Sequence, residues 1–272
     1  MTEFKSKKNN MAKKIIYTIL VFVGTLIAIL ILQDITRFIY SVLMLDANIK
    51  AALQSISLDA NALYQIILLI ATILAIVLYK CFSKTDVGLT KGNWKLGIKL
   101  SLIGSVLILI STFIKVITLP AIDLPLNTIS LPYDKITYDY ITSCVLAPIA
   151  EELLFRSLLI TVLSKILAPK PNENNTLAVE EKRGLFKTLN SSNLVPPIVA
   201  AIAFSMAHIG VTFFPFSIDF SLRQTVSTMF LGLLTGYVFV KTKSVYYCIY
   251  LHFFANFCLQ TYIVISFIAY IS

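Results

Sequence analysis

Long apolar segments, each about as long as a bilayer is thick, most constrain how this chain can fold. A transmembrane helix needs roughly 20 largely apolar residues, because the hydrocarbon core is about 30 Å thick and each residue rises 1.5 Å. Such segments lie at 15–33, 62–82, 96–117, 137–163, 195–214, 221–241 and 245–271. The last segment is long enough for one helix, or for two with a break near 258–262. We therefore predict an all-α fold, a polytopic membrane helical bundle of about 7–8 transmembrane helices.

The composition agrees with a membrane protein. Hydrophobic residues make up 57% of the chain and charged residues 14%, and the mean hydropathy is +0.83, whereas about a quarter of the residues of soluble domains are charged. The net charge of +9 does not indicate a nucleic-acid partner, because polytopic proteins collect Lys and Arg on cytoplasmic loops. The cysteines form no CxxC pair, and we expect them to be buried small hydrophobic residues: Cys81, Cys144, Cys248 and Cys258.

The distribution of basic residues predicts the orientation in the membrane. If the N-terminus is cytoplasmic, 17 of the 23 Lys and Arg residues lie on the cytoplasmic side and five on the outer side. This bias favours a cytoplasmic N-terminus. Lysines precede the first segment as in a signal peptide, but its apolar run is long and no small-residue cleavage site follows, so we expect an uncleaved helix. Residues 34–61 are expected to include an outer interfacial helix.

Ionisable side chains interrupt three of the predicted spans. Each costs about 3 kcal/mol on insertion scales, so such residues usually face an interior cavity and act there. In the segment EELLFR, Glu152 and Arg156 are spaced i,i+4 on one helix face, and we predict a structural ion pair between them. Glu151 points about 100° away around the helix. A buried carboxylate that does not share this Arg suits a general base or a metal ligand.

The other two interruptions contain the only two histidines of the chain. His208 lies in FSMAHIG in the fifth span, and His252 lies in YLHFFANF in the last span, with Asn256 on the same face. Because they accompany the acidic pair in one half of the chain, we expect one shared site. A Glu carboxylate can take a proton from water, a His can orient that water, and an Asn amide can donate to an oxyanion.

A metal ion is the alternative means of activating water. Glu151, His208 and His252 are candidate ligands of a divalent metal such as zinc, which lowers the pKa of bound water. The sequence contains no HExxH motif of soluble zinc proteases, and nothing pairs Ser205 with a base as a nucleophile. Both routes lead to hydrolysis of a carbonyl compound, most simply a peptide bond. The sequence leaves the need for a cofactor open.

At these residues the chain resembles the CPBP family of intramembrane proteases, the CAAX proteases and bacteriocin-processing proteins, also called Abi. The family pattern EExxxR, FxxxH and HxxxN reads here as Glu151-Glu152-x-x-x-Arg156, Phe204-x-x-x-His208 and His252-x-x-x-Asn256. The resemblance covers about 137–260 and implies that Glu151, with His208 beside it, activates the attacking water. It implies that His252 and Asn256 stabilise the oxyanion or complete the site, and that Glu152 and Arg156 hold the helix. Metalloprotease and metal-free mechanisms have both been described for the family.

The resemblance divides the chain into residues 1–136, transmembrane helices without a motif, 137–260, a CPBP-like catalytic core, and 261–272, the end of the last helix. It implies an integral-membrane endopeptidase that acts on peptides or membrane-associated proteins, and we expect its cavity to open to the cytosol. The Ile-, Lys- and Asn-rich composition is typical of bacteria, so we expect a protein of a bacterial cell membrane. A leader peptide, bacteriocin or signalling peptide is then a better substrate than a prenylated protein.

Two other classes of function remain open from the sequence. Relatives in the family are linked to bacteriocin self-immunity and to the regulation of membrane sensor kinases, so the chain could act by binding while keeping the site residues. A proton-coupled transporter would also use buried Glu and His, but it predicts internal repeats, and none is visible. Membrane lipid and a peptide or membrane-protein substrate are the expected partners, and no oligomeric state follows from the sequence.

Overall fold

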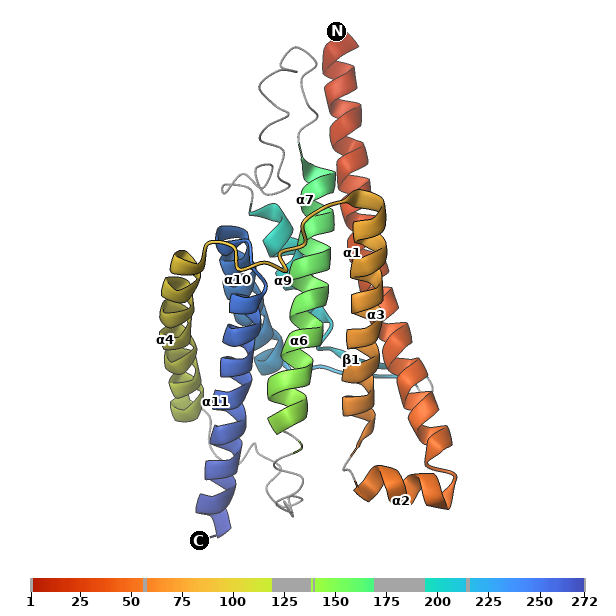
Figure 1. Cartoon of the computed structure of the whole chain (residues 1–272), viewed down its shortest axis with the longest axis vertical. Coiled ribbons are helices and arrows are strands. Elements are labelled where there is room, and N and C mark those ends of the chain that lie inside the picture. Colours follow the sequence, from red (N-terminus) through yellow and green to blue (C-terminus); the bar gives the residue numbers. More distant parts are fainter. Residues whose placement is uncertain are drawn as a thin grey trace.

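The computed structural model of the chain describes residues 2–55, 58–118, 138, 140–168, 194–213 and 216–271. In this part of the chain eight helices form a bundle, and the longest, α1 (Thr2–Leu43), extends along the long axis of the molecule (Figure 1). Five of them are long and apolar enough to cross a membrane, by length and composition. The predicted all-α bundle is confirmed.

Most helices follow the predicted apolar segments closely. The long helix through the acidic pair is continuous but alternates between π-helical and α-helical turns, as η3 (Ile141–Leu146), α6 (Ala147–Glu152), η4 (Leu153–Ile160) and α7 (Thr161–Leu167). The other helices are α1 (Thr2–Leu43), α2 (Ala47–Ser55), α3 (Ala60–Ser83), α4 (Trp94–Thr118), α9 (Val195–Met206), α10 (Leu222–Thr242) and α11 (Tyr246–Ile271).

Cap residues set several of these boundaries. The side chain of Asp59 accepts a hydrogen bond from the backbone N–H of Ala62 and begins α3, and Ser221 does the same for α10 through the N–H of Gln224. Such caps satisfy backbone donors that the first helical turn leaves without partners. Lys84 and Lys243 follow the last turns of α3 and α10 in the left-handed conformation, which ends both helices.

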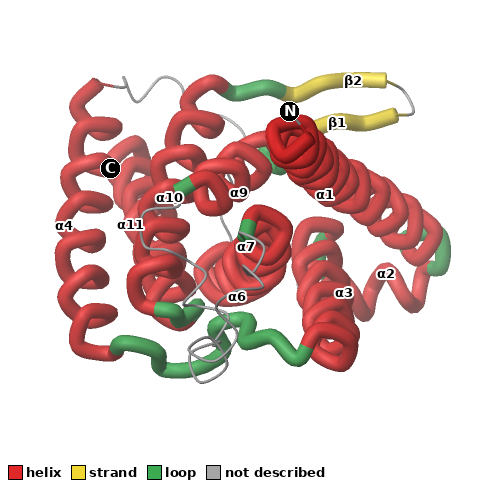
Figure 2. The backbone as a smooth tube through the Cα atoms, turned by 90° about the horizontal axis from the view of Figure 1, so that it is seen from above, coloured by secondary structure: helices red, strands yellow, loops and turns green. Residues whose placement is uncertain are grey.

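The predicted fifth span, 195–214, is wrong beyond Met206. The helix α9 ends there and a hairpin follows, formed by β1 (Gly210–Phe213) and β2 (Phe216–Asp219), which pair as antiparallel strands at the side of the bundle next to α1 (Figure 2). A hydropathy window counts Val211 and Ile218 as apolar in either conformation. Their β-branched side chains favour a strand, but the length of an apolar segment alone does not distinguish a helix from a strand.

The structure also decides three smaller points of the sequence analysis. The first helix continues to Leu43, so only α2, at 47–55, occupies the place of the expected outer interfacial helix. The last segment is one unbroken helix, α11, with no interruption at 258–262, which decides between the two readings of that segment. Cys81 is exposed rather than buried, and Cys258 is only partly buried, whereas Cys144 and Cys248 are buried as predicted.

At each end of the bundle, hydrogen bonds connect segments that are far apart in the sequence. At the end where α1 begins, which we call the N-terminal end, the N–H of Asn93 donates to the carbonyl of Thr242 at 2.8 Å, and the N–H of Val245 donates to the carbonyl of Gly88 at 2.9 Å. The loop between α3 and α4 therefore docks on the turn between α10 and α11.

The opposite end, which we call the distal end, contains the C-terminal end of α1 and the start of α3 (Figure 1). Arg37 donates to the carbonyl of Val211 in the hairpin at 3.1 Å. The hydroxyl of Tyr138 lies 3.1 Å from the carboxylate of Asp59. Segments that the charge count assigned to one side of the membrane thus lie at one end of the molecule.

Small residues bring α9 and α10 close together. A Cβ added at Gly232 would lie 3.1 Å from the Cα of Ala201, and one added at Gly236 would lie 3.0 Å from the Cβ of Pro197. Both are tighter than ordinary van der Waals contact, so the small-xxx-small spacing acts here as a packing feature. The approach places Thr235, one residue before Gly236, next to the central helix.

We predict that Gly92→Ala destabilises the docked loop. Gly92 has a φ of +53°, and an added Cβ would run into the carbonyl of Thr242. The left-handed conformation alone costs an L-residue about 1–2 kcal/mol, so the thermal unfolding midpoint in detergent should fall. Gly24→Ala is the matched control, because nothing lies within 4 Å of its added Cβ. Equal midpoints for the two variants would contradict the prediction.

Candidate active site

The acidic pair lies on the helix at the centre of the bundle. The segments η3, α6 and η4 pack against α3, α9, α10 and α11, which surround them (Figure 2). Glu152 is 0% exposed and Glu151 is 9% exposed. Neighbouring residues of a helix point about 100° apart, and here the two carboxylates reach different partners.

Glu152 belongs to a buried polar network. Its Oε2 lies 2.9 Å from Nε of Arg156, and its Oε1 lies 2.9 Å from Nδ1 of His252. The same Arg156 donates to the hydroxyl of Thr235 on α10. All of these side chains are buried, so the expected ion pair is present and joins three helices. The sequence reasoning did not identify Thr235 as a partner.

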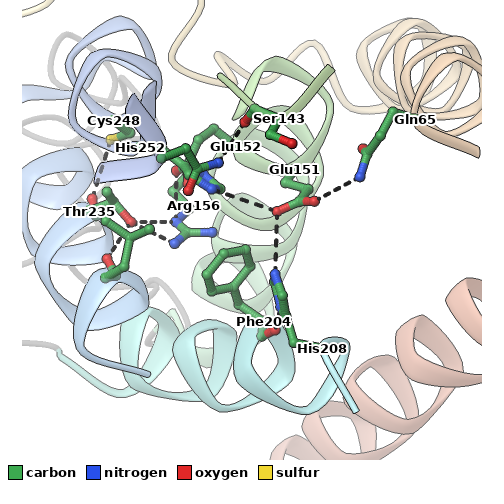
Figure 3. Close-up of polar contacts among 12 residues, drawn as sticks. Gln65, Ser143, Glu151, Glu152, Arg156, Phe204, His208, Thr235, Cys248 and His252 are labelled. Carbon is green, nitrogen blue, oxygen red and sulfur yellow. Dashed lines mark hydrogen bonds and ion pairs between the residues drawn. The ribbon is translucent and has the colours of Figure 1, made fainter. Parts of the chain in front are cut away.

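Glu151 has one fixed oxygen and one without a partner. Its Oε1 accepts a hydrogen bond from Nε2 of Gln65 on α3 at 3.1 Å. Its Oε2 is buried and has no hydrogen-bond partner among the described residues. The Nε2 atoms of His208 and His252 each lie 3.9 Å from Oε2 (Figure 3). The structure thus brings together three side chains that are far apart in the sequence.

The orientations of the two imidazole rings follow from their other nitrogen atoms. Nδ1 of His208 lies 2.8 Å from the carbonyl oxygen of Phe204, and Nδ1 of His252 faces the carboxylate of Glu152. Since both partners are acceptors, the proton of each neutral ring belongs on Nδ1. Each Nε2 then presents a lone pair towards the space beside Glu151.

Phe204 forms the wall against which these rings pack. Its ring is fully buried and meets the rings of His208 and His252 edge to face, with centroids 4.7 and 5.5 Å apart. The guanidinium of Arg156 lies over it at 4.5 Å. The FxxxH motif therefore supplies a side chain that orients both imidazoles.

Three details differ from the sequence prediction or extend it. His208 lies in the turn after α9, two residues beyond its last residue, rather than inside a membrane helix. Asn256 donates from Nδ2 to the carbonyl of Ser143 at 2.6 Å and ties α11 to η3. The hydroxyl of Ser205 donates to the carbonyl of Thr225, so it is not directed at His208.

A cavity of about 800 Å³ lies beside this cluster. Its walls include Glu151, His208, His252 and Asn256, together with Gln65. Gln65 was overlooked in the sequence, although a polar side chain within an otherwise apolar span is a detectable signal. The predicted site residues therefore surround a space large enough for a segment of peptide.

The cavity lies in the distal half of the bundle. Its lining comes from 29–37, 60–68, 108–115, 143–155, 207–210, 221–231 and 252–263. These are the halves of the helices farthest from the end where α1 begins (Figure 1). We predicted both a cytoplasmic N-terminus and a cavity open to the cytosol, and this placement means that the two cannot both be correct.

The cluster does not have the geometry of a metal centre. Two ligands of one tetrahedral zinc ion lie roughly 3.4 Å apart when each bond is about 2.1 Å long, whereas Oε2 of Glu151 is 3.9 Å from both Nε2 atoms. Among the described residues, no group of three or more His, Cys, Asp and Glu side chains is arranged to hold a metal ion. We therefore derive no reaction step through a metal.

We predict that Glu152→Ala destabilises the fold. The variant leaves the guanidinium of Arg156 buried without its carboxylate, and breaking a buried pair in this way costs about 3–5 kcal/mol. Membrane abundance and the unfolding midpoint in detergent should both fall. Glu151→Gln is the control, because it keeps the shape of a side chain that does not pair with Arg156. The same loss of stability in both variants would contradict the different assignments of the two carboxylates.

Residues 134–258 match the model of a protein family described as type II CAAX prenyl endopeptidase Rce1-like. The matched segment contains every residue of the three motifs, and it agrees with the resemblance to CPBP proteases. No curated protein and no solved structure matches the chain. The apolar helices together with this match identify an integral membrane protein, and residues 134–258 are similar to the Rce1-like CAAX endopeptidase domain.

Proposed function

We propose that the protein is an intramembrane endopeptidase in which Glu151 activates water for attack on a peptide bond. The observation that supports this proposal is the unpartnered Oε2 of Glu151, which is buried and faced by two imidazole Nε2 atoms at 3.9 Å. These distances are too long for direct hydrogen bonds. The carboxylate is therefore available to accept a proton from a water molecule that enters from the cavity.

The reaction needs no covalent intermediate with the protein. Glu151 takes one proton of the water as the water oxygen forms a bond to the carbonyl carbon, and His208 orients that water through its Nε2 lone pair. The tetrahedral oxyanion then collapses, the C–N bond breaks, and the proton held by Glu151 passes to the leaving nitrogen. The products are a carboxylic acid and an amine, and the carboxylate of Glu151 is regenerated.

His252 and Asn256 are proposed to complete the site. One N–H of the Asn256 amide donates to Ser143, and an amide group has a second N–H that can donate to the developing oxyanion. The ring of His252 is held by Glu152, which is itself held by Arg156. The proposed role of Glu152 and Arg156 is thus to position the groups that contact substrate.

Gln65 is proposed as a positioning residue for Glu151. Its Nε2 donates to Oε1, so Oε2 is directed towards the two imidazoles instead of rotating away. This residue lies on α3, outside the segment that matches the family. The N-terminal helices would therefore contribute to the catalytic geometry as well as anchor the domain.

The proposed substrates are peptides or membrane-associated proteins, such as a bacterial leader or signalling peptide. The family match supports a peptide or protein substrate at the level of its class. A protein that acts only by binding, for example in bacteriocin immunity, would need the cavity but not the chemistry of Glu151. Substitution of this one carboxylate therefore separates the two functions.

We predict that Glu151→Gln abolishes function in cells at normal membrane abundance. The amide cannot accept the proton, and loss of a general base lowers a rate by about 10²–10⁴-fold. His208→Ala should give a smaller loss, because Glu151 remains. Abundance is measured by immunoblot of membranes, and activity by cleavage of candidate peptides with the purified protein.

Full function of both variants would overturn the enzyme proposal and leave a protein that acts by binding. With purified protein, cleavage in the presence of a chelator separates a metal-free reaction from one that needs an ion. Glu152→Ala is not a substitute for this comparison, because it is expected to change the amount of folded protein.

We predict that Gln65→Leu lowers kcat with little change in KM. A lost hydrogen bond to a charged group is worth about 1.5–3 kcal/mol, so the rate should fall roughly tenfold to a hundredfold. Gln65→Asn should restore part of the rate, because it keeps an amide donor on the same helix face. A change in KM alone, or in protein abundance alone, would indicate a role in substrate binding or in packing instead.

A further inference from the structure

We propose that the cavity opens towards the extracytoplasmic side of the membrane, so that the protease receives its peptide from outside the cell. The substrate would then be a peptide, or a loop of a membrane protein, presented at the outer face of the bilayer. The substrate class rests on the proposed function, whereas the side of the opening is a separate property that can be measured without any activity.

The lining of the cavity shows at which end of the bundle it lies. On α3 it begins with Ala60 in the first turn, and on α4 it extends to Lys115 in the last turn. On α10 it begins at the cap residue Ser221. These helix termini all lie at the distal end, so the cavity extends from the central carboxylate to that end of the molecule.

Contacts between distant segments show which loops lie together at each end of the bundle. The loop at 84–93 bonds to the turn at 242–245, and the side chain of Lys14 donates to the carbonyl of Leu167. Arg37 bonds to the hairpin, on the same side as the cavity. Each described basic residue outside the central polar network can therefore be assigned to one end from contacts and helix directions.

The basic residues are concentrated at the end away from the cavity. From Lys13 onwards, the described basic residues of the N-terminal end are Lys13, Lys14, Lys80, Lys84, Lys91, Lys95, Lys99, Lys165, Lys241 and Lys243. Those of the distal end are fewer: Arg37, Lys50, Lys115 and Arg223. The side with more Lys and Arg in short loops stays in the cytoplasm. By this rule the distal end, with the cavity, faces outwards.

The part of the cavity near the distal end is polar enough to admit water and peptide. This part is lined by Asn61 and Gln224 and by three basic residues, Arg37, Lys115 and Arg223. The other ionisable residues that line the cavity are Glu151, His208 and His252. A basic entrance above a carboxylate base favours peptides that carry acidic groups. It also provides a route for the water that hydrolysis consumes.

Cysteine labelling in intact cells tests the side of the opening. Asn61→Cys and Gln224→Cys place a thiol on exposed residues of the cavity wall, and Lys91→Cys and Lys95→Cys place one on exposed residues of the N-terminal end. A membrane-impermeant maleimide should label the first pair at least tenfold more than the second. Permeabilised cells should label all four alike.

The native cysteines provide the background for this measurement. Cys81 is exposed near the N-terminal end, so the four variants are made with Cys81→Ser, and that parent variant is labelled in parallel. The proposal would be overturned if, in intact cells, the reagent labelled Lys91→Cys and Lys95→Cys but not Asn61→Cys and Gln224→Cys. That result would place the opening in the cytosol.

A blocking experiment connects the side of the opening with function. A bulky impermeant maleimide on Gln224→Cys should abolish, in intact cells, the same function that Glu151→Gln abolishes, while the reagent on Lys95→Cys leaves it unchanged. A block that appears only after permeabilisation would overturn the proposal. If Glu151→Gln retains function, the protease proposal fails, but the labelling pattern still decides the side of the opening.

Discussion

The buried pair of Glu152 and Arg156 is the interaction on which the rest of the site depends. Both side chains are buried at the centre of the bundle, where an unpaired charge is expensive, so each requires the other. Their spacing of four residues makes the pair local, and its remaining bonds are to other helices: His252 on α11 and Thr235 on α10. One ion pair therefore fixes the central helix and the orientation of an imidazole at once.

This arrangement separates two adjacent residues of the same chemical type. Each carboxylate oxygen of Glu152 lies 2.9 Å from a nitrogen of Arg156 or His252, whereas Oε2 of Glu151 lies 3.9 Å from the Nε2 atoms of both histidines. A helix places consecutive side chains on different faces. Glu152 meets the guanidinium of Arg156, from the same helix, and Nδ1 of His252, whereas Glu151 meets the amide of Gln65 and the Nε2 atoms of the two imidazoles. Identical carboxylates thereby acquire different environments without any difference in their own structure.

Residues that belong to a motif could be grouped from the sequence, and contacts of residues outside the motifs could not. The i,i+4 ion pair and the grouping of Glu151, His208 and His252 were predicted, because motifs and helical geometry determine them. The contact of Gln65 with Glu151 was not predicted: a polar residue within an apolar span can be noticed in the sequence, but its partner depends on the packing of α3 on the central helix. The hairpin after α9 was also missed, since hydropathy does not distinguish apolar strands from apolar helices. Which end of the bundle contains the cavity depends on how seven separate segments pack together, and a local sequence pattern does not reveal that packing.

The two histidines are supported in different ways. His252 lies in the second turn of a long helix with its side chain 4% exposed, whereas His208 lies on a turn between α9 and a short hairpin with its side chain 22% exposed. Moving His252 would require repacking of a membrane helix, but moving His208 requires only a change in a few backbone angles. The candidate site thus combines one imidazole held by a long helix with one held by a short turn, so a peptide that enters the cavity would displace His208 more easily than His252.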